Sequence, residues 1–317
     1  MLMNDKKCPI CKSYNLNKTK KKLRSGKLDF ILSCDKCQFY FLTTNPIDNL
    51  ISNKLDETRL KSAGLKIPNI KKDFENGTNQ SKPLIEKYFA KSDINKNILE
   101  IGCSWGYFIN LMKINKCKPY GIELNQVRNQ FVNNKLNIKC FNNLDECENY
   151  NIKFHKIFLF YVIEYIPDIS NYLNKLINLL EDGGKIILIT PNLNDYLKDG
   201  FSNIGYKNFF YDDNAINYFS VKSLKRIMNK ISHNNYSIKT EQGYSFLNHY
   251  NWYLTNKPKT TGIVGGDNFI NQLTDKLDLD ISFTSEIKSL IKNFDKSYKD
   301  ILNRNNYGNN IIIEISK

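Results

Sequence analysis

The pattern of hydrophobic positions alternates between short apolar runs and longer segments with apolar residues at helical spacing. The run 156–161 is apolar at nearly every position, which is typical of a parallel strand covered on both faces. The segment 169–180 places apolar residues three and four apart and so predicts an amphipathic helix. The predicted strands are 98–101, 120–122, 138–141, 156–161, 185–192, 236–239 and 310–315. The predicted helices are 83–91, one that begins near Phe108, 126–135, 169–180, 221–231 and several within 268–303.

A glycine-bracketed turn joins the first of these strands to the helix that follows it. Gly102 and Gly106 bracket the turn, where a side chain would block either the turn or a ligand. Strand, turn and helix together form a unit that lets a cofactor approach backbone amides at a helix N-terminus. Glu123 follows the next strand, where a carboxylate is placed to bond ribose hydroxyls. The dinucleotide fingerprint would also need glycine at two positions that Ser104 and Tyr107 occupy, so the chain fails it.

The acid before the turn, Glu100, completes a Glu-x-Gly-x-x-x-Gly pattern with Gly102 and Gly106. This pattern resembles class I S-adenosylmethionine-dependent methyltransferases, whose cofactor has no pyrophosphate and does not need the full dinucleotide glycine set. The alternative is an ordinary strand-to-helix turn of another α/β protein. The resemblance implies an α/β fold with a doubly wound, seven-stranded Rossmann-like sheet, S-adenosyl-L-methionine as cofactor, and adenine contacts from Asn143 and Leu144. The cofactor-binding residues that it implies are Glu100, Gly102, Ser104, Gly106, Tyr107, Glu123, Leu124, Asn143, Leu144 and Tyr161.

The chain after the fourth predicted strand supports the same resemblance. Residues 162–168 are similar to the family's Leu-Glu-His-(Ile/Val)-x-Asp segment, and Glu164 matches the family's Glu. Tyr165 stands where His is usual, so a histidine base at that position is excluded. A helix, the pair Gly183–Gly184 and a strand ending in Thr-Pro-Asn follow in the family's order. This order as an ensemble favours the family over other α/β proteins.

A second resemblance concerns residues 244–254, which are rich in aromatic side chains. They are similar to a Tyr-Ser-Leu-Ala-Asn-His-x-x-Trp-Leu segment of bacterial methyltransferases in glycan and cell-surface sugar pathways. This implies a small hydroxylated acceptor, a sugar or nucleotide-sugar, and transfer to a hydroxyl needs a base. His249 and Glu164 are the two catalytic candidates. A helical insertion at about 247–305 is expected to form a lid or the dimer surface of a homo-oligomer, and 194–219 a loop over the site.

Two Cys-x-x-Cys pairs near the start of the chain have the spacing of a zinc ribbon. Cys8 and Cys11 form the first pair and Cys34 and Cys37 the second, with a predicted hairpin turn at 24–27 between them. Four thiolates favour Zn²⁺, and a closed four-cysteine shell predicts a structural ion. Redox pairs are the alternative. The expected organisation is a zinc ribbon at 1–45, a linker at 46–79 with a short helix near 56–62, and a methyltransferase domain at 80–317.

The formal net charge of +14 does not change the prediction of a small-molecule acceptor. Lysine supplies nearly all of the positive charge and is spread along the chain, whereas nucleic-acid readers more often use arginine. A zinc-ribbon RNA methyltransferase, similar in layout to ribosomal guanine-N1 enzymes, is the alternative function. A catalytically silent cofactor-binding protein is a third, which the intact cofactor pattern disfavours.

Targeting signals are absent from the sequence pattern. The first residues lack the apolar core of a signal peptide, and the longest apolar run, 157–163, is too short to cross a bilayer. We therefore expect a cytoplasmic protein whose cysteines are thiols or metal ligands. On the charge pattern above, nucleic acid is not the expected partner.

Overall fold

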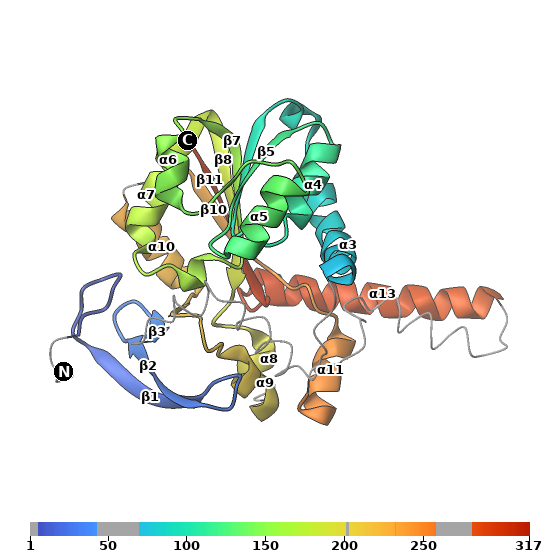
Figure 1. Ribbon diagram of the computed structural model, residues 1–317. Helices are drawn as coiled ribbons and strands as arrows, with labels where there is room; N and C mark the ends of the chain where they lie inside the picture. The colour runs from blue at the N-terminus through green and yellow to red at the C-terminus, as the bar shows by residue number, and fades with distance from the viewer. Residues whose placement is uncertain (1–5, 43–69, 201–202, 232, 258–280) are drawn as a thin grey trace.

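The computed structural model describes residues 6–42, 70–200, 203–231, 233–257 and 281–317. A central sheet with helices on both faces makes up most of the molecule, and a smaller antiparallel sheet lies at one end of it (Figure 1). The short helix expected near 56–62 and the first part of the helices expected within 268–303 lie outside the described residues.

The central sheet has seven strands, and its chain order reverses at the middle. The strands are β4 (Asn97–Ile101), β5 (Lys118–Ile122), β6 (Cys140–Phe141), β7 (Phe154–Phe160), β8 (Leu180–Pro191), β10 (Tyr236–Glu241) and β11 (Asn310–Ser316). They lie in the order β10-β11-β8-β7-β4-β5-β6, and all neighbours are parallel except β11, which is antiparallel to β10 and β8. The doubly wound, seven-stranded fold expected from the sequence is confirmed. The reversal at β4, with β5 on one side and β7 on the other, is where ligands gather in such folds.

Helices cover both faces of this sheet, and each face has its own hydrophobic core. The described helices that precede β10 are α3 (Ile70–Tyr88), α4 (Tyr107–Ile114), α5 (Gln126–Asn134), α6 (Leu144–Asn149), α7 (Ile169–Leu179), α8 (Tyr196–Asp199), α9 (Ile204–Phe210) and α10 (Val221–Lys230), with 3₁₀ turns η2 (Lys91–Asp93) and η3 (Ile163–Tyr165). On one face, α7 and α10 contribute Leu173, Leu176 and Ile227 to the core. On the other face, α4 contributes Phe108 and Met112, with α3 beside it (Figure 1).

Helix α3 begins at Ile70, well before the predicted start, and occupies part of the segment expected to be a linker. Phe74 explains this extension, because its ring packs on those of Tyr107 and Phe131 at centroid distances of 5.6 and 5.7 Å. Gly77 faces the same tyrosine, and a Cβ there would lie 2.5 Å from its ring. A glycine that suggests a linker in the sequence therefore serves close packing of α3 on the start of α4.

Two boundaries in the central sheet also differ from the prediction. Helix α7 ends at Leu179, before Gly183–Gly184, and β8 starts at once because Leu180 pairs with Phe154 of β7. The edge strand β6 is shorter than predicted and comprises Cys140–Phe141.

The N-terminal residues form a small sheet that a strand from the middle of the chain completes. Its strands are β1 (Leu16–Lys22), β2 (Leu28–Cys34), β3 (Tyr40–Leu42) and β9 (Asn217–Tyr218). They lie in the order β1-β2-β3-β9, and β9 pairs with β3 through Tyr40 with Tyr218 and Phe41 with Asn217. The segment 194–219, expected as a loop, instead contains α8, α9 and β9. The ribbon is thus joined to the rest of the chain by a shared sheet.

In the described part of the segment between β10 and β11, two helices confirm the expected helical insertion before the last strand. They are α11 (Phe246–Thr255) and α13 (Ile281–Arg304). The two helices pack through Phe246, whose ring lies 5.1 Å from that of Phe294 and 5.2 Å from that of Tyr298. Helix α13 extends past the edge of the central sheet (Figure 1). Among the described residues, no helix has the length and apolar character needed to span a membrane.

Candidate active site

The turn between β4 and α4 holds three residues with left-handed backbone. Gly102 has φ 70°, Ser104 φ 52° and Gly106 φ 80°. A Cβ at Gly102 would lie 2.8 Å from Val162 Cγ2, and one at Gly106 would lie 2.8 Å from Leu136 Cδ1. Both glycines are therefore required by conformation and by space. Ser104 adopts the same conformation at a cost of roughly 1–2 kcal/mol, so the surrounding contacts must hold the turn in place.

Glu123 supplies those contacts from the end of β5. Its Oε2 accepts a hydrogen bond from the backbone N–H of Ser104 at 2.9 Å, and its Oε1 accepts one from Asn125 N at 2.8 Å. Each carboxylate oxygen has a further lone pair with which to accept a ligand hydroxyl. Burial raises the pKa of this carboxyl. The neighbouring Leu124 is exposed.

Glu100 lies buried on β4, immediately before the turn. Among the described residues, its Oε2 has no hydrogen-bond partner. Burial, and to a lesser extent the charge of Glu123, raises the pKa of the Glu100 carboxyl to about 8. A positive charge nearby would restore its ionised form. The sulfonium and ammonium groups of S-adenosylmethionine are such charges, so this donor set fits the cofactor that the sequence implies.

Three other predicted cofactor residues secure the helices around the turn. Asn143 Oδ1 accepts a hydrogen bond from Glu146 N at 2.8 Å and caps α6, whose first residue, Leu144, is buried. The Tyr107 hydroxyl donates to Asp73 of α3 at 3.2 Å. Asn143 remains exposed to solvent at the carboxyl end of β6.

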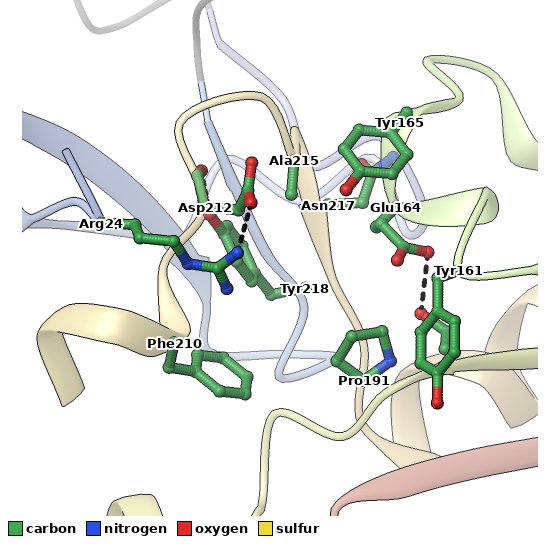
Figure 2. A pocket seen from close by; sticks show the side chains of 11 residues that line it. Arg24, Tyr161, Glu164, Tyr165, Pro191, Phe210, Asp212, Ala215, Asn217 and Tyr218 are labelled. Atoms are coloured by element: carbon green, nitrogen blue, oxygen red, sulfur yellow. Dashed lines mark hydrogen bonds and ion pairs between the residues drawn. The ribbon is translucent and has the colours of Figure 1, made fainter. Parts of the chain in front are cut away.

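Two adjoining cavities of about 300 Å³ each lie beside the carboxyl ends of β7 and β8. They share the wall residues Arg24, Tyr161, Pro191 and Phe210. The first cavity, seen in Figure 2, is completed by Glu164, Tyr165, Thr190, Asp212, Ala215, Asn217 and Tyr218. The second cavity is completed by Tyr206, Phe209, Gly243, Tyr244, Asn309 and Asn310.

The glycine turn and the first cavity meet at one short segment. Val162, which a Cβ at Gly102 would touch, lies between Tyr161 and Glu164, and both of these line the cavity. Tyr161 directly follows β7 with φ 58°, and its side chain is half exposed. Left-handed backbone at a tyrosine is the kind of strain that clusters at functional sites.

Glu164 is an acidic group in the wall of the first cavity. It lies in η3, is 4% exposed, and its Oε2 accepts a hydrogen bond from Thr190 Oγ1 at 3.2 Å. Its backbone carbonyl accepts from Ile216 N at 2.9 Å, and the carbonyl of Ile216 accepts from Leu42 N at 2.9 Å. The ribbon therefore supports the backbone that positions Glu164 through one intermediate residue.

Arg24 enters the cavities from the hairpin tip of the ribbon, a contact that the sequence analysis did not predict. Its Nε donates to the carbonyl of Phe209 at 2.8 Å, and its Nη1 pairs with Asp212 Oδ2 at 2.9 Å. The guanidinium carbon lies 4.2 Å from the centroid of the Phe209 ring. Figure 2 shows Arg24 and Glu164 on opposite sides of the first cavity. The available signal was an arginine at a hairpin tip in a chain whose basic residues are mostly lysine.

The sequence profile of a methyltransferase domain matches residues 75–237, slightly more than half of the chain. The chain belongs to this methyltransferase domain family. No curated protein matches the sequence.

Solved structures that resemble this methyltransferase come from several enzymes of the same kind. An S-adenosylmethionine-dependent methyltransferase from Archaeoglobus fulgidus has 16% identity and a TM-score of 0.47, with 76% of this chain and 94% of that chain covered. A possible histamine N-methyltransferase from Thermotoga maritima has 14% identity and a TM-score of 0.43, with 77% and 90% covered. A plantazolicin methyltransferase in complex with S-adenosylhomocysteine has 12% identity and a TM-score of 0.46, with 86% and 95% covered.

His249 of this methyltransferase is not brought into either cavity, contrary to the expectation that it could act as the base. It is fully buried, with Nε2 3.0 Å from Gln242 Nε2 and Nδ1 2.6 Å from Tyr298 Oη. Gln242 Oε1 accepts from Asn309 N at 3.0 Å, so the amide nitrogen faces His249 and donates to its Nε2. Burial lowers the pKa of His249 to about 4. His249 is thus held in its neutral form, outside both cavities. Of the two candidate bases, Glu164 is the one that lines a cavity.

The four predicted zinc ligands lie together in the ribbon. The Sγ atoms of Cys8, Cys11, Cys34 and Cys37 all lie within 4.8 Å of one another. The Cys8–Cys37 and Cys11–Cys34 sulfur pairs are each 3.4 Å apart. Tetrahedral Zn²⁺ with sulfur ligands at about 2.3 Å separates them by about 3.8 Å, so small shifts would admit the ion. Four thiols that close the shell fit a structural zinc rather than a catalytic one.

Proposed function

We propose that this methyltransferase transfers a methyl group from S-adenosylmethionine to a hydroxyl of a small acceptor, a sugar or nucleotide-linked sugar. The observation that carries the proposal is the close approach of Gly102 to Val162. Because Tyr161 and Glu164 flank Val162 and line the first cavity, an acceptor in that cavity would lie next to the cofactor turn.

The cofactor supplies a methyl group on a positively charged sulfur, which makes that carbon electrophilic. Gly102 and Gly106 would let it approach the backbone of the turn, and Glu123 would accept hydrogen bonds from the ribose hydroxyls. The Glu100 carboxyl would balance its positive charge. The remaining residues proposed to contact the cofactor are Ser104, Tyr107, Leu124, Asn143, Leu144 and Tyr161.

Glu164 is the proposed base. It would take the hydroxyl proton of the acceptor while the acceptor oxygen forms its bond to the methyl carbon and the bond from that carbon to sulfur breaks, which leaves S-adenosylhomocysteine. The hydrogen bond from Thr190 and the backbone bond from Ile216 hold the carboxylate at the cavity wall, so it needs little reorganisation for this step.

The chemistry of the cavities favours a small hydroxylated acceptor. Each cavity has the volume of a small-molecule site. The rings of Tyr165, Phe210 and Tyr218 present apolar faces that can cover a sugar ring, and the Arg24 guanidinium provides hydrogen-bond donors. An RNA duplex exceeds this volume, which leaves a single flipped base as the way an RNA could use the site.

Transfer of a labelled methyl group tests the acceptor. Zinc-loaded protein with labelled S-adenosylmethionine should label nucleotide-sugar or glycan fractions of the native cell and leave ribosomal and transfer RNA unlabelled. Robust labelling of RNA, with none on any carbohydrate pool, would instead establish an RNA methyltransferase.

The Glu164→Gln variant tests the base. It should lower turnover by roughly 10²–10⁴ and leave the affinity for S-adenosylhomocysteine within about twofold. Glu286→Gln, the same change at an exposed position of α13, is the matched control and should have full activity. Full activity in Glu164→Gln would remove Glu164 from this role.

A further inference from the structure

A third hollow, here called the basic groove, lies between the ribbon and helices α8 and α9. Its volume is about 670 Å³. Helix α9 separates it from the acceptor cavities: Tyr206, Phe209 and Phe210 line the cavities, whereas Ile204 and Lys207 line the groove. The basic groove is therefore a site of its own, on the opposite face of α9.

The lysines of the groove come from three separate segments. Lys20, Lys21 and Lys22 belong to β1, Lys198 to α8 and Lys207 to α9. Among the described residues that line the groove, Asp199 is the one carboxylate, and its Oδ1 lies 2.6 Å from Lys198 Nζ. The other four lysines add positive charge around the groove, with Lys21 Nζ beside the ring of Tyr211. A bound anion would offset the repulsion between these like charges.

The aromatic side chains of the groove favour a ligand that carries a flat ring in addition to negative charge. Tyr40, Tyr211 and Tyr307 line the groove, and Lys21 Nζ lies 5.8 Å from the centroid of the Tyr211 ring. Lysines neutralise phosphates as point charges, and tyrosine rings stack on bases. The volume is that of a small-molecule site rather than an extended track for a polynucleotide.

We propose that the basic groove binds the diphosphate and base of a nucleoside diphosphate. This goes beyond the proposed function, because the basic groove lies apart from the acceptor cavities and shares no lining residue with them. Binding of the nucleotide itself is measured without methyl transfer, so the two proposals fail separately.

Titration calorimetry of the zinc-loaded protein with UDP, ADP and inorganic pyrophosphate tests the groove. Saturating S-adenosylhomocysteine keeps the probes out of the cofactor site. The nucleotides should bind with micromolar dissociation constants, more tightly than pyrophosphate, and more weakly as salt is raised.

The variant Lys20→Glu/Lys22→Glu should weaken nucleotide binding at least tenfold, and Lys207→Glu on α9 should weaken it several-fold without touching the ribbon. Lys222→Glu/Lys225→Glu, the same charge change on exposed positions of α10, is the matched control and should have no effect. Zinc content and circular dichroism show that each variant is folded.

Three results would overturn the proposal. They are no binding of either nucleotide at millimolar concentration, equal losses in the groove and control variants, and single-stranded RNA displacing the nucleotides at far lower concentration. Nucleotide binding without any transfer to nucleotide-linked sugars would leave the groove in place and refute the acceptor.

Discussion

Arg24→Ala tests whether the ribbon is held to the methyltransferase body through its hairpin tip. The substitution removes the hydrogen bond from Nε to the Phe209 carbonyl, the ion pair with Asp212 and the contact with the Phe209 ring. It also removes the Arg24 cation from beside the Asp212 carboxylate, whose side chain is 9% exposed.

The magnitude follows from these contacts. A hydrogen bond from a charged donor contributes about 1.5–3 kcal/mol and a cation–ring contact about 0.5–1 kcal/mol. Removing one partner of a fully buried ion pair costs about 3–5 kcal/mol, but the Arg24 side chain is 22% exposed and solvent screens part of that. These contributions are not additive in one cluster, so we expect the free energy of unfolding to fall by about 3 kcal/mol.

Urea unfolding of the zinc-loaded protein measures this loss, and hydrogen exchange locates it in α9 and β9. The variant Arg24→Ala/Asp212→Asn is the control, because it also removes the carboxylate charge while Asn214 can still donate to the side-chain oxygen. It should recover about 1–2 kcal/mol of the loss. A loss below about 0.5 kcal/mol in Arg24→Ala, or no recovery in the double variant, would refute the reasoning.

Three further predictions concern the metal, the cofactor and pH. Elemental analysis should find one zinc per chain, and a zinc-free native protein would contradict this. Removing the zinc with a chelator should speed hydrogen exchange at the amides of β3 and β9, and should leave the affinity for S-adenosylhomocysteine within about twofold. Glu123→Ala should weaken cofactor binding in calorimetry by about 1.5–3 kcal/mol, because it removes a charged acceptor, and unchanged affinity would take Glu123 out of the site. Burial gives His249 a pKa of about 4 in the folded state, against about 6.5 in the unfolded state. Between these pH values the unfolded state binds more protons than the folded state. The free energy of unfolding should therefore fall by up to about 3 kcal/mol as the pH drops from 6.5 to 4. Denaturation of His249→Gln across this range should show a smaller fall than the parent protein, and an identical fall would contradict the assignment.

The central sheet was predictable because its signals are local. Near-continuous apolar runs mark strands that must be buried on both faces, and the glycine turn has a steric cause at both Gly102 and Gly106. The four cysteines were predictable for the same reason, since their spacing alone defines a metal site. The structure places these residues as expected, and the cofactor and zinc assignments remain predictions on that geometry.

The features of the fold and of the site that could not be predicted from the sequence depend on contacts between distant segments. Strand β9 is two residues long and exists because β3 pairs with it, and Arg24 became a cavity residue through the same docking. Gly77 and His249 had local patterns typical of a linker and of a catalytic group. Their neighbours, Tyr107 in one case and Gln242 with Tyr298 in the other, are set by tertiary contacts that the local patterns do not reveal.

The pairing of β3 with β9 also decides where this chain can be cut and recombined. Deleting the ribbon would leave β9 without its neighbour β3 and would remove the backbone donor of Leu42 from Ile216, the residue that holds Glu164. To transfer acceptor preference between homologues, an exchange should therefore include both the ribbon and residues 194–219. These two segments are distant in the sequence but form one structural unit.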